Sequence, residues 1–170
     1  FLRSQVLGSN TRLWLMTDHP VDTPQAAQRV FQMYRTRWAI EDAFKFIKQS
    51  HADGKPFFLY LPYTIPHAEL VLPDDEIIQH YQSLGWPETP YYGSHYGDQM
   101  TPHAAFAAMI TRMDRDIGRA MELVDSLGLD GDTIFVFTSD NGALHGTHEG
   151  LAGTDSLFFN SNGGLRDGKG

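Results

Sequence analysis

The chain has 170 residues, of which 41% are hydrophobic, and this is enough for one domain with a modest core. Its 13 Lys and Arg residues against 21 Asp and Glu residues give a net charge of −8, which argues against a DNA-binding surface spread over the whole chain. Cysteine is absent, and this excludes disulfides, thiolate nucleophiles and Cys-based zinc sites. No apolar run is long enough to span a bilayer, so we expect no membrane partner.

The first third of the chain predicts a strand followed by a long helix. Residues 12–16, Arg-Leu-Trp-Leu-Met, are typical of a short strand. Thr23-Pro24 then predicts a helix start, with Thr as the N-cap and Pro in the first turn. Apolar residues spaced three to four apart predict that this helix covers residues 25–49.

The middle of the chain predicts a buried strand and then an irregular excursion. Residues 57–61, Phe-Phe-Leu-Tyr-Leu, favour a strand that ends in a loop with two prolines, residues 62–67. The segment 74–96 is rich in prolines and aromatics, and we expect a surface excursion with one short helix over residues 75–84. Long connections of this kind often carry function or lie over a site.

A second long helix precedes the most apolar strand candidate. Thr101-Pro102 predicts its start, and Gly128 suits its end. Its expected buried face consists of Phe106, Met109, Ile110, Met113, Ile117, Met121 and Val124. Residues 133–139 then predict a strand that is buried on both faces, whereas residues 142–170 predict little regular structure. The succession of helix, turn, buried strand and polar loop indicates an α/β fold.

Asp140 and Asn141 directly follow this strand candidate. Open α/β sheets place their chemistry beyond the carboxyl ends of the strands. A carboxylate beside a side-chain amide offers the hard oxygens that Ca²⁺ or Mg²⁺ prefers. Asp-Asn-Gly is also good turn chemistry, so these residues alone leave a simple turn open.

Four stretches of the sequence together carry a resemblance to a known family. They are residues 55–68, with Pro66-His67-Ala68 at the end; residues 113–129; residues 133–142; and residues 158–170, which end in Gly-Lys-Gly. In this order they resemble the sulfatase family of the alkaline-phosphatase-like superfamily. The resemblance implies a partial alkaline-phosphatase-like α/β sheet with flanking helices, and it implies hydrolysis of sulfate esters. The implied substrate is a sulfated small molecule or glycan.

The resemblance also implies roles for four residues. Asp140 and Asn141 match two ligands of the family's divalent cation, usually Ca²⁺, with Mg²⁺ possible. His67 matches the histidine at the sulfate ester or its leaving oxygen, and Lys169 matches the lysine that binds the sulfate. Sulfate ester cleavage builds negative charge on the leaving oxygen, which a cation, an imidazole and an ammonium stabilise. Outside the family context, His67 and Lys169 are typical of an ordinary loop histidine and a surface charge.

Other parts of the family's site are missing. Its formylglycine nucleophile is made from a Cys or Ser in a Cys/Ser-x-Pro/Ala-x-Arg motif, and no residue of this chain begins that pattern. The early pair of aspartate ligands is absent as well. Because these parts are missing, we expect that this polypeptide alone hydrolyses no sulfate ester. The chain starts without Met and ends in a Gly-rich loop, so we also expect a fragment. His145 and His148 lie in a glycine-rich loop; the resemblance gives them no role, and we interpret them as loop residues.

The first 48 residues carry a different pattern, Tyr-x2-Arg-x3-Glu-x6-Lys, at Tyr34, Arg37, Glu41 and Lys48. On a helix these residues share one face. The pattern resembles the late part of DDE-type insertion-sequence transposases, which implies that Glu41 belongs to a Mg²⁺ site and that DNA is a partner. The alternative is an amphipathic helix with ion pairs at helical spacing.

These two resemblances predict two parts. Residues 1–48 form a transposase-like segment of a strand plus a long helix, and residues 49–170 form a partial sulfatase catalytic domain. A DNA-binding or DNA-processing fragment is the alternative function. Localisation is left open.

Overall fold

A short antiparallel pair of strands opens the computed structural model, which describes residues 2–5, 12–15, 23, 40–92, 96–143, 157–165 and 168. Strand β1 (Leu2–Gln5) pairs with β2 (Arg12–Leu15), with Leu2 opposite Leu15. β2 confirms the strand that we predicted over residues 12–16, whereas β1 was not predicted.

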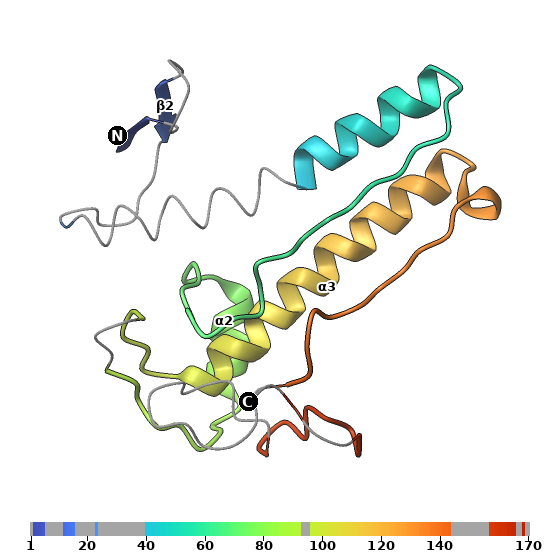
Figure 1. Cartoon of the computed structure of the whole chain (residues 1–170). Helices are drawn as coiled ribbons and strands as arrows, with labels where there is room; N and C mark the ends of the chain where they lie inside the picture. Colours follow the sequence, from blue (N-terminus) through green and yellow to red (C-terminus); the bar gives the residue numbers. More distant parts are fainter. Residues whose placement is uncertain are drawn as a thin grey trace.

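Helices dominate the described part of the chain after residue 40. One helix covers residues 40–52, and the earlier part of the helix predicted over residues 25–49 lies outside the described residues. It is followed by α2 (Glu76–Ser83), α3 (Pro102–Ser126) and the short 3-10 helix η1 (Asp130–Asp132). α2 and α3 confirm the predicted helices. In Figure 1 the helix over residues 40–52 runs along the C-terminal half of α3, and α2 lies beside its N-terminal half.

The two labelled helices begin in different ways. The Asp75 carboxylate caps α2 by accepting a hydrogen bond from the Ile77 backbone N–H at 3.1 Å. Thr101 makes no such side-chain bond at the start of α3. The Glu88 carboxylate does so instead, accepting from the backbone N–H groups of residues 103 and 104, both at 2.9 Å. A residue 13 positions before Thr101 therefore caps α3 and ties the preceding connection to it.

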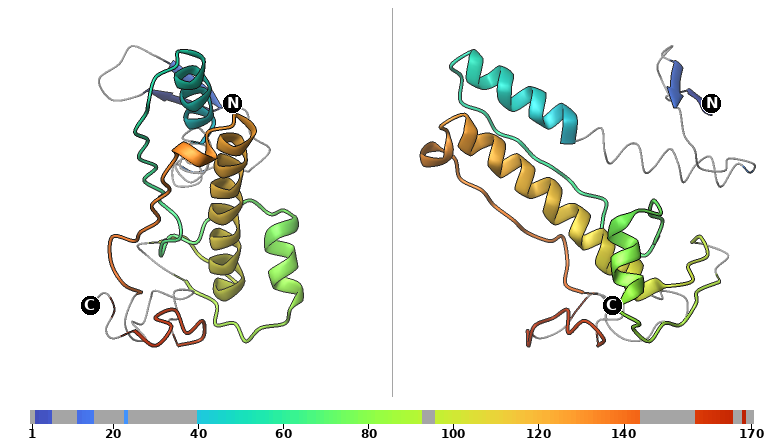
Figure 2. Two further views of the ribbon diagram at one scale, coloured as in Figure 1. Left: turned by 90° about the vertical axis from the view of Figure 1, so that its right-hand side faces the viewer. Right: turned by 180° about the vertical axis from the view of Figure 1, so that it is seen from behind.

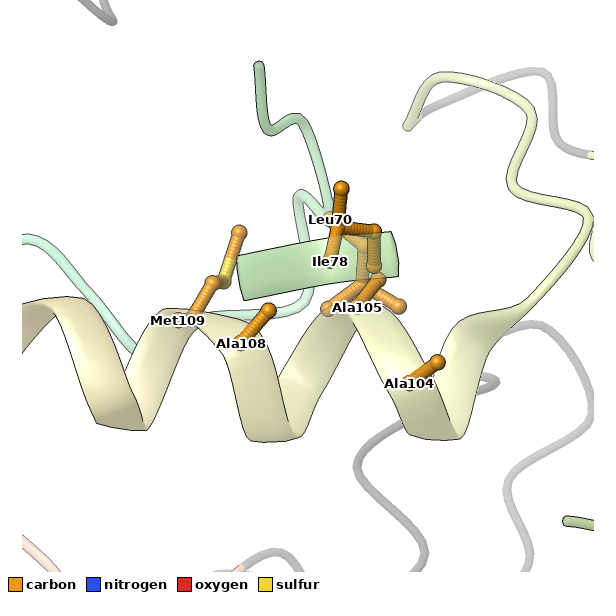
Figure 3. Close-up of a cluster of buried hydrophobic side chains, with 6 residues drawn as sticks. All are labelled: Leu70, Ile78, Ala104, Ala105, Ala108 and Met109. Carbon is orange, nitrogen blue, oxygen red and sulfur yellow. The ribbon is translucent and has the colours of Figure 1, made fainter. Parts of the chain in front are cut away.

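The main core lies between α2 and the first half of α3, which run side by side (Figure 3). Its buried members are Leu70, Ile78, Ala104, Ala105, Ala108 and Met109. Small alanine side chains let the backbone of a neighbouring helix approach closely, so the alanine face of α3 is the face that packs. This corrects part of the predicted face: Met109 and Val124 are buried, whereas Met121 is 47% exposed.

A second contact joins the helix over residues 40–52 to α3. Its apolar residues Ile40, Ala43 and Ile47 are buried. The Arg119 guanidinium of α3 lies 4.8 Å from the centre of the Phe44 ring and 3.4 Å from a Glu41 carboxylate oxygen. Cation–π and ion-pair contacts of this exposed kind contribute modestly, so the apolar burial carries most of the stabilisation.

The strands predicted over residues 57–61 and 133–139 are wrong for this structure. Both segments run as extended chain back along α3 toward its N-terminal end (Figures 1 and 2), and neither pairs with a strand among the described residues. Phe58 is 88% exposed and Ile134 is 90% exposed. A strand needs hydrogen bonds from neighbouring strands, and the described residues supply none here. Among the described residues after residue 40, regular secondary structure is consequently helical, and these residues form no covered α/β sheet.

None of the helices in the described part of the chain has the length and apolar character needed to cross a bilayer.

Candidate functional site

Asp140 and Asn141 follow the extended segment 133–139, and both are exposed. The Ser139 hydroxyl lies 3.5 Å from one Asp140 carboxylate oxygen. Carboxylate and amide oxygens in this position fit a hard divalent cation chemically, but Ca²⁺ takes six to eight oxygen ligands, so the pair forms only part of a coordination shell. Within the described ranges, no three His, Cys, Asp or Glu residues come together as a metal-binding group.

His67 lies in the loop that follows the other extended segment, residues 57–61. Its ring is exposed and meets the Tyr96 ring edge to face, with 6.1 Å between the centroids and an interplanar angle of 77°. The tyrosine therefore restricts the imidazole on one side while leaving the rest of the ring open to a ligand.

Two hydrogen bonds anchor the chain just beyond His67. A Glu69 carboxylate oxygen accepts from the Gly97 backbone N–H at 3.1 Å, and the Gln99 side-chain amide donates to the Leu70 carbonyl at 2.8 Å. Leu70 itself is buried in the core between α2 and α3. His67 therefore belongs to a loop whose following residues are held in place.

Tyr63, earlier in the same loop, has a buried hydroxyl with no hydrogen-bond partner among the residues that the structure describes. Burial raises the pKa of Tyr63, and the nearby Asp116 charge raises it further, against the opposing effect of Arg119. The hydroxyl therefore stays protonated at neutral pH.

The extended segments 57–61 and 133–139 run in the same direction along α3 (Figures 1 and 2). The loop that carries His67 and the Asp140–Asn141 pair consequently both follow segments that lead to the N-terminal end of α3. The roles predicted for these three residues stay predictions. Lys169, together with His145 and His148, lies outside the described residues.

The chain before Lys169 is held by aromatic contacts. The His103 ring stacks on the Phe158 ring with 4.1 Å between centroids and an interplanar angle of 3°. The Trp86 ring meets Phe158 and Phe159 edge to face at 5.4 and 5.9 Å. Sequence reasoning missed this cluster, although the Phe158-Phe159 pair in a polar, glycine-rich segment was the signal for it.

Glu41, the carboxylate singled out by the transposase resemblance, contacts Arg119 of α3 at 3.4 Å. One turn away, Lys45 lies 3.3 Å from Asp42. Such contacts suit the alternative interpretation, an amphipathic helix with ion pairs. Tyr34 and Arg37 lie outside the described residues, and the transposase resemblance stays a prediction.

Comparison with known families decides the identity of the chain. A sequence profile of the family described as Sulfatase matches residues 4–170. This chain belongs to the sulfatase family. The match extends over most of residues 1–48, for which we predicted a transposase-like segment. Family membership implies the alkaline-phosphatase-like α/β fold, although the described part of this sulfatase segment is mostly helical.

Three curated relatives show the extent of the likeness. The N-acetylgalactosamine-6-sulfatase of Rattus norvegicus is 27% identical over 158 residues, which cover 88% of this chain and 25% of the relative. The steryl-sulfatase of Mus musculus is 30% identical over 136 residues, with 79% and 18% covered. The arylsulfatase of Clostridium perfringens is 26% identical over 137 residues, with 68% and 28% covered. The chain thus spans about a quarter of the length of the curated relatives it matches.

Proposed function

We propose that this sulfatase segment supplies part of the active site of a sulfuric ester hydrolase. The observation that carries the proposal is that two extended segments, each of which follows a helix, run in the same direction along α3. Residues 57–61 lead to His67 and residues 133–139 lead to Asp140-Asn141, and both segments run toward one end of α3. This common course supports a site in which the His67 imidazole and the oxygens of Asp140 and Asn141 face the same anionic group.

The residues divide the work by their chemistry. Asp140 and Asn141 bind the divalent cation, which is Ca²⁺ with Mg²⁺ as a possible substitute, and the cation supplies positive charge beside the sulfate oxygens. His67 contacts the leaving oxygen, to which an imidazole can donate a proton near neutral pH. Lys169 binds the sulfate through its ammonium group.

The substrate class is a sulfated small molecule or glycan. Support comes from the names of the relatives, which include an N-acetylgalactosamine-6-sulfatase and the ulvan-active sulfatase of Formosa agariphila, 27% identical over 118 residues. The exposed His67 side chain suits a ligand that approaches from solvent.

The extended segments become strands of the alkaline-phosphatase-like sheet when neighbouring strands pair with them. Their apolar side chains support this proposal, because Val136 and Phe137 are exposed although residues of this kind are usually buried. Pairing would also satisfy the backbone groups of residues 57–61 and 133–139.

The 170-residue polypeptide alone hydrolyses no sulfate ester, because it lacks cysteine and the Cys/Ser-x-Pro/Ala-x-Arg motif that yields the formylglycine nucleophile. An aryl sulfate assay on the purified chain tests this expectation. Turnover that disappears in Asp140→Ala would contradict it.

Calcium-dependent thermal stabilisation tests the cation site itself. At a Ca²⁺ concentration about 100 times the Kd, binding to the folded state alone adds about 2.7 kcal/mol to the free energy of unfolding. The stabilisation should vanish in Asp140→Ala and Asn141→Ala. Asp130→Ala is the matched control, since Asp130 is also exposed but lies in η1, before residues 133–139. Equal stabilisation of the wild type and Asp140→Ala would overturn the proposed site.

A further inference from the structure

Residues 84–101, which we call the α2–α3 connection, touch both loops that the proposed function uses. The structure describes this connection except for residues 93–95. Its first arm, near Trp86, contacts the segment before Lys169, and its second arm, near Gln99, contacts the segment after His67. These two loops lie about 100 residues apart in sequence, and one connection that contacts both of them can hold them relative to each other.

The first arm is built as a fixed aromatic support. Glu88 anchors it by accepting hydrogen bonds from the first backbone N–H groups of α3. Trp86 then presents its ring to Phe158 and Phe159, and His103 at the start of α3 stacks on Phe158. Aromatic pairs in these geometries contribute beyond their buried area, so the arm holds the chain that leads to Lys169.

The second arm holds the histidine loop through polar contacts. The Gly97 backbone N–H donates to the Glu69 carboxylate, and the Gln99 side-chain amide donates to the Leu70 carbonyl. Tyr96 meets the His67 ring directly. Because these contacts involve two consecutive loop residues and the imidazole itself, they set both the path of the loop and the tilt of the ring.

The two arms are joined to each other. The backbone groups of Tyr91 and Gln99 exchange hydrogen bonds of 2.8 and 2.9 Å in an isolated antiparallel bridge. The bridge therefore links the two arms within the described part of the connection.

We propose that the α2–α3 connection is the positioning element of this site and that Trp86 and Glu69 are positioning residues. Trp86 holds Phe158 and Phe159, which precede Lys169 in the sequence, and Glu69 fixes the loop of His67. The proposal rests on the proposed function for the roles of His67 and Lys169, whereas the contacts that carry it stand by themselves.

Hydrogen exchange measured by mass spectrometry on the full chain tests the support directly. Trp86→Ala should speed exchange over residues 157–165, and Glu69→Ala should speed it over residues 66–70, each about fivefold, as expected for the loss of one net hydrogen bond or a similar contact. The conservative variants Trp86→Phe and Glu69→Gln keep the ring and the accepting oxygen, so they should restore slow exchange. Unchanged exchange in both alanine variants, or equally fast exchange in their conservative counterparts, would overturn the proposal.

A titration with inorganic sulfate, followed by the NMR signals of the His67 ring and the Lys169 side chain, tests positioning for function. The wild-type chain should respond at both groups. Trp86→Ala and Glu69→Ala should bind about fivefold more weakly, with rescue by the conservative variants. A wild-type response that neither alanine variant weakens overturns the positioning role and leaves the proposed function standing. Silence in the wild type contradicts the proposed function, and the exchange rates then decide by themselves whether the connection holds the two loops.

Discussion

The helices and the extended segments of this chain both carry large apolar side chains, but these side chains lie in opposite environments. Met109 of α3 is 1% exposed, whereas Ile134 of the segment 133–139 is 90% exposed. Helices satisfy their backbone hydrogen bonds within themselves, and strands satisfy theirs only through neighbours. Local sequence is therefore enough for an amphipathic run to form a helix, whereas an apolar run becomes a buried strand only where other strands pair with it.

The largest expected effect comes from a substitution in the packed core between α2 and α3. Met109→Ala should lower the free energy of unfolding by about 2–5 kcal/mol, because it removes a buried side chain and leaves a cavity between α2 and α3. Met121→Ala on the same helix is the matched control, since Met121 is 47% exposed. Urea denaturation followed by circular dichroism measures both variants. Equal losses in the two would contradict the assignment of the alanine face as the packed face.

A smaller effect is expected at the start of α2. Asp75 caps this helix and pairs with Arg112 of α3. Burial alone would raise the pKa of Asp75, but the hydrogen bond and charge of Arg112, with the backbone N–H groups of Ile77 and Ile78, hold it below the ordinary value of 3.8. Asp75→Ala should cost about 1–2 kcal/mol through the lost cap, and Asp75→Asn should cost less because asparagine also caps helices.

The pH dependence of stability follows from the same group. Because the pKa of Asp75 is lower in the folded state, its contribution is fully present above pH 3.8 and is lost as the pH falls below that value. Unfolding measured from pH 6 to pH 2.5 should show a smaller acid-induced loss in Asp75→Asn than in the wild type. Parallel pH profiles would show that the Asp75–Arg112 pair does not stabilise the folded state.

The smallest expected effect comes from a substitution in the exposed segment, residues 133–139. Ile134→Thr should change the free energy of unfolding by less than about 0.5 kcal/mol, because the side chain loses little buried contact. The same replacement at Ile78, which is buried in the core, should be clearly destabilising. A large loss at Ile134, measured by thermal unfolding, would show that residues 133–139 are already packed in solution.

Local sequence predicted what local physics decides. Pro102 in the first turn and Gly128 beyond the end placed α3 correctly, and residues 75–84 contained α2. The cap that Glu88 provides could not be predicted, because it joins residues 15 and 16 positions apart through a connection with no periodic pattern. The packed face of α3 was partly missed, since large apolar residues carry the hydrophobic signal while alanines permit the close approach.

The candidate site divides in the same way. His67, Asp140 and Asn141 were predicted at the ends of apolar runs, and the structure places them in loops after those runs. The strand pairing that would fix those ends depends on partners that the described residues do not supply. The support from Trp86 and Glu69 was invisible in sequence because it rests on contacts between distant loops.

One measurement tests the central claim most directly: a titration with Mn²⁺, a paramagnetic cation that shares the oxygen ligands preferred by Ca²⁺ and Mg²⁺, followed by NMR line broadening. If Asp140 and Asn141 bind the cation and the neighbouring loops face it, the signals of Asp140, Asn141, His67 and Lys169 broaden together, and excess Ca²⁺ reverses the effect. Broadening that spares His67 and Lys169, or that persists unchanged in Asp140→Ala, would contradict a shared site.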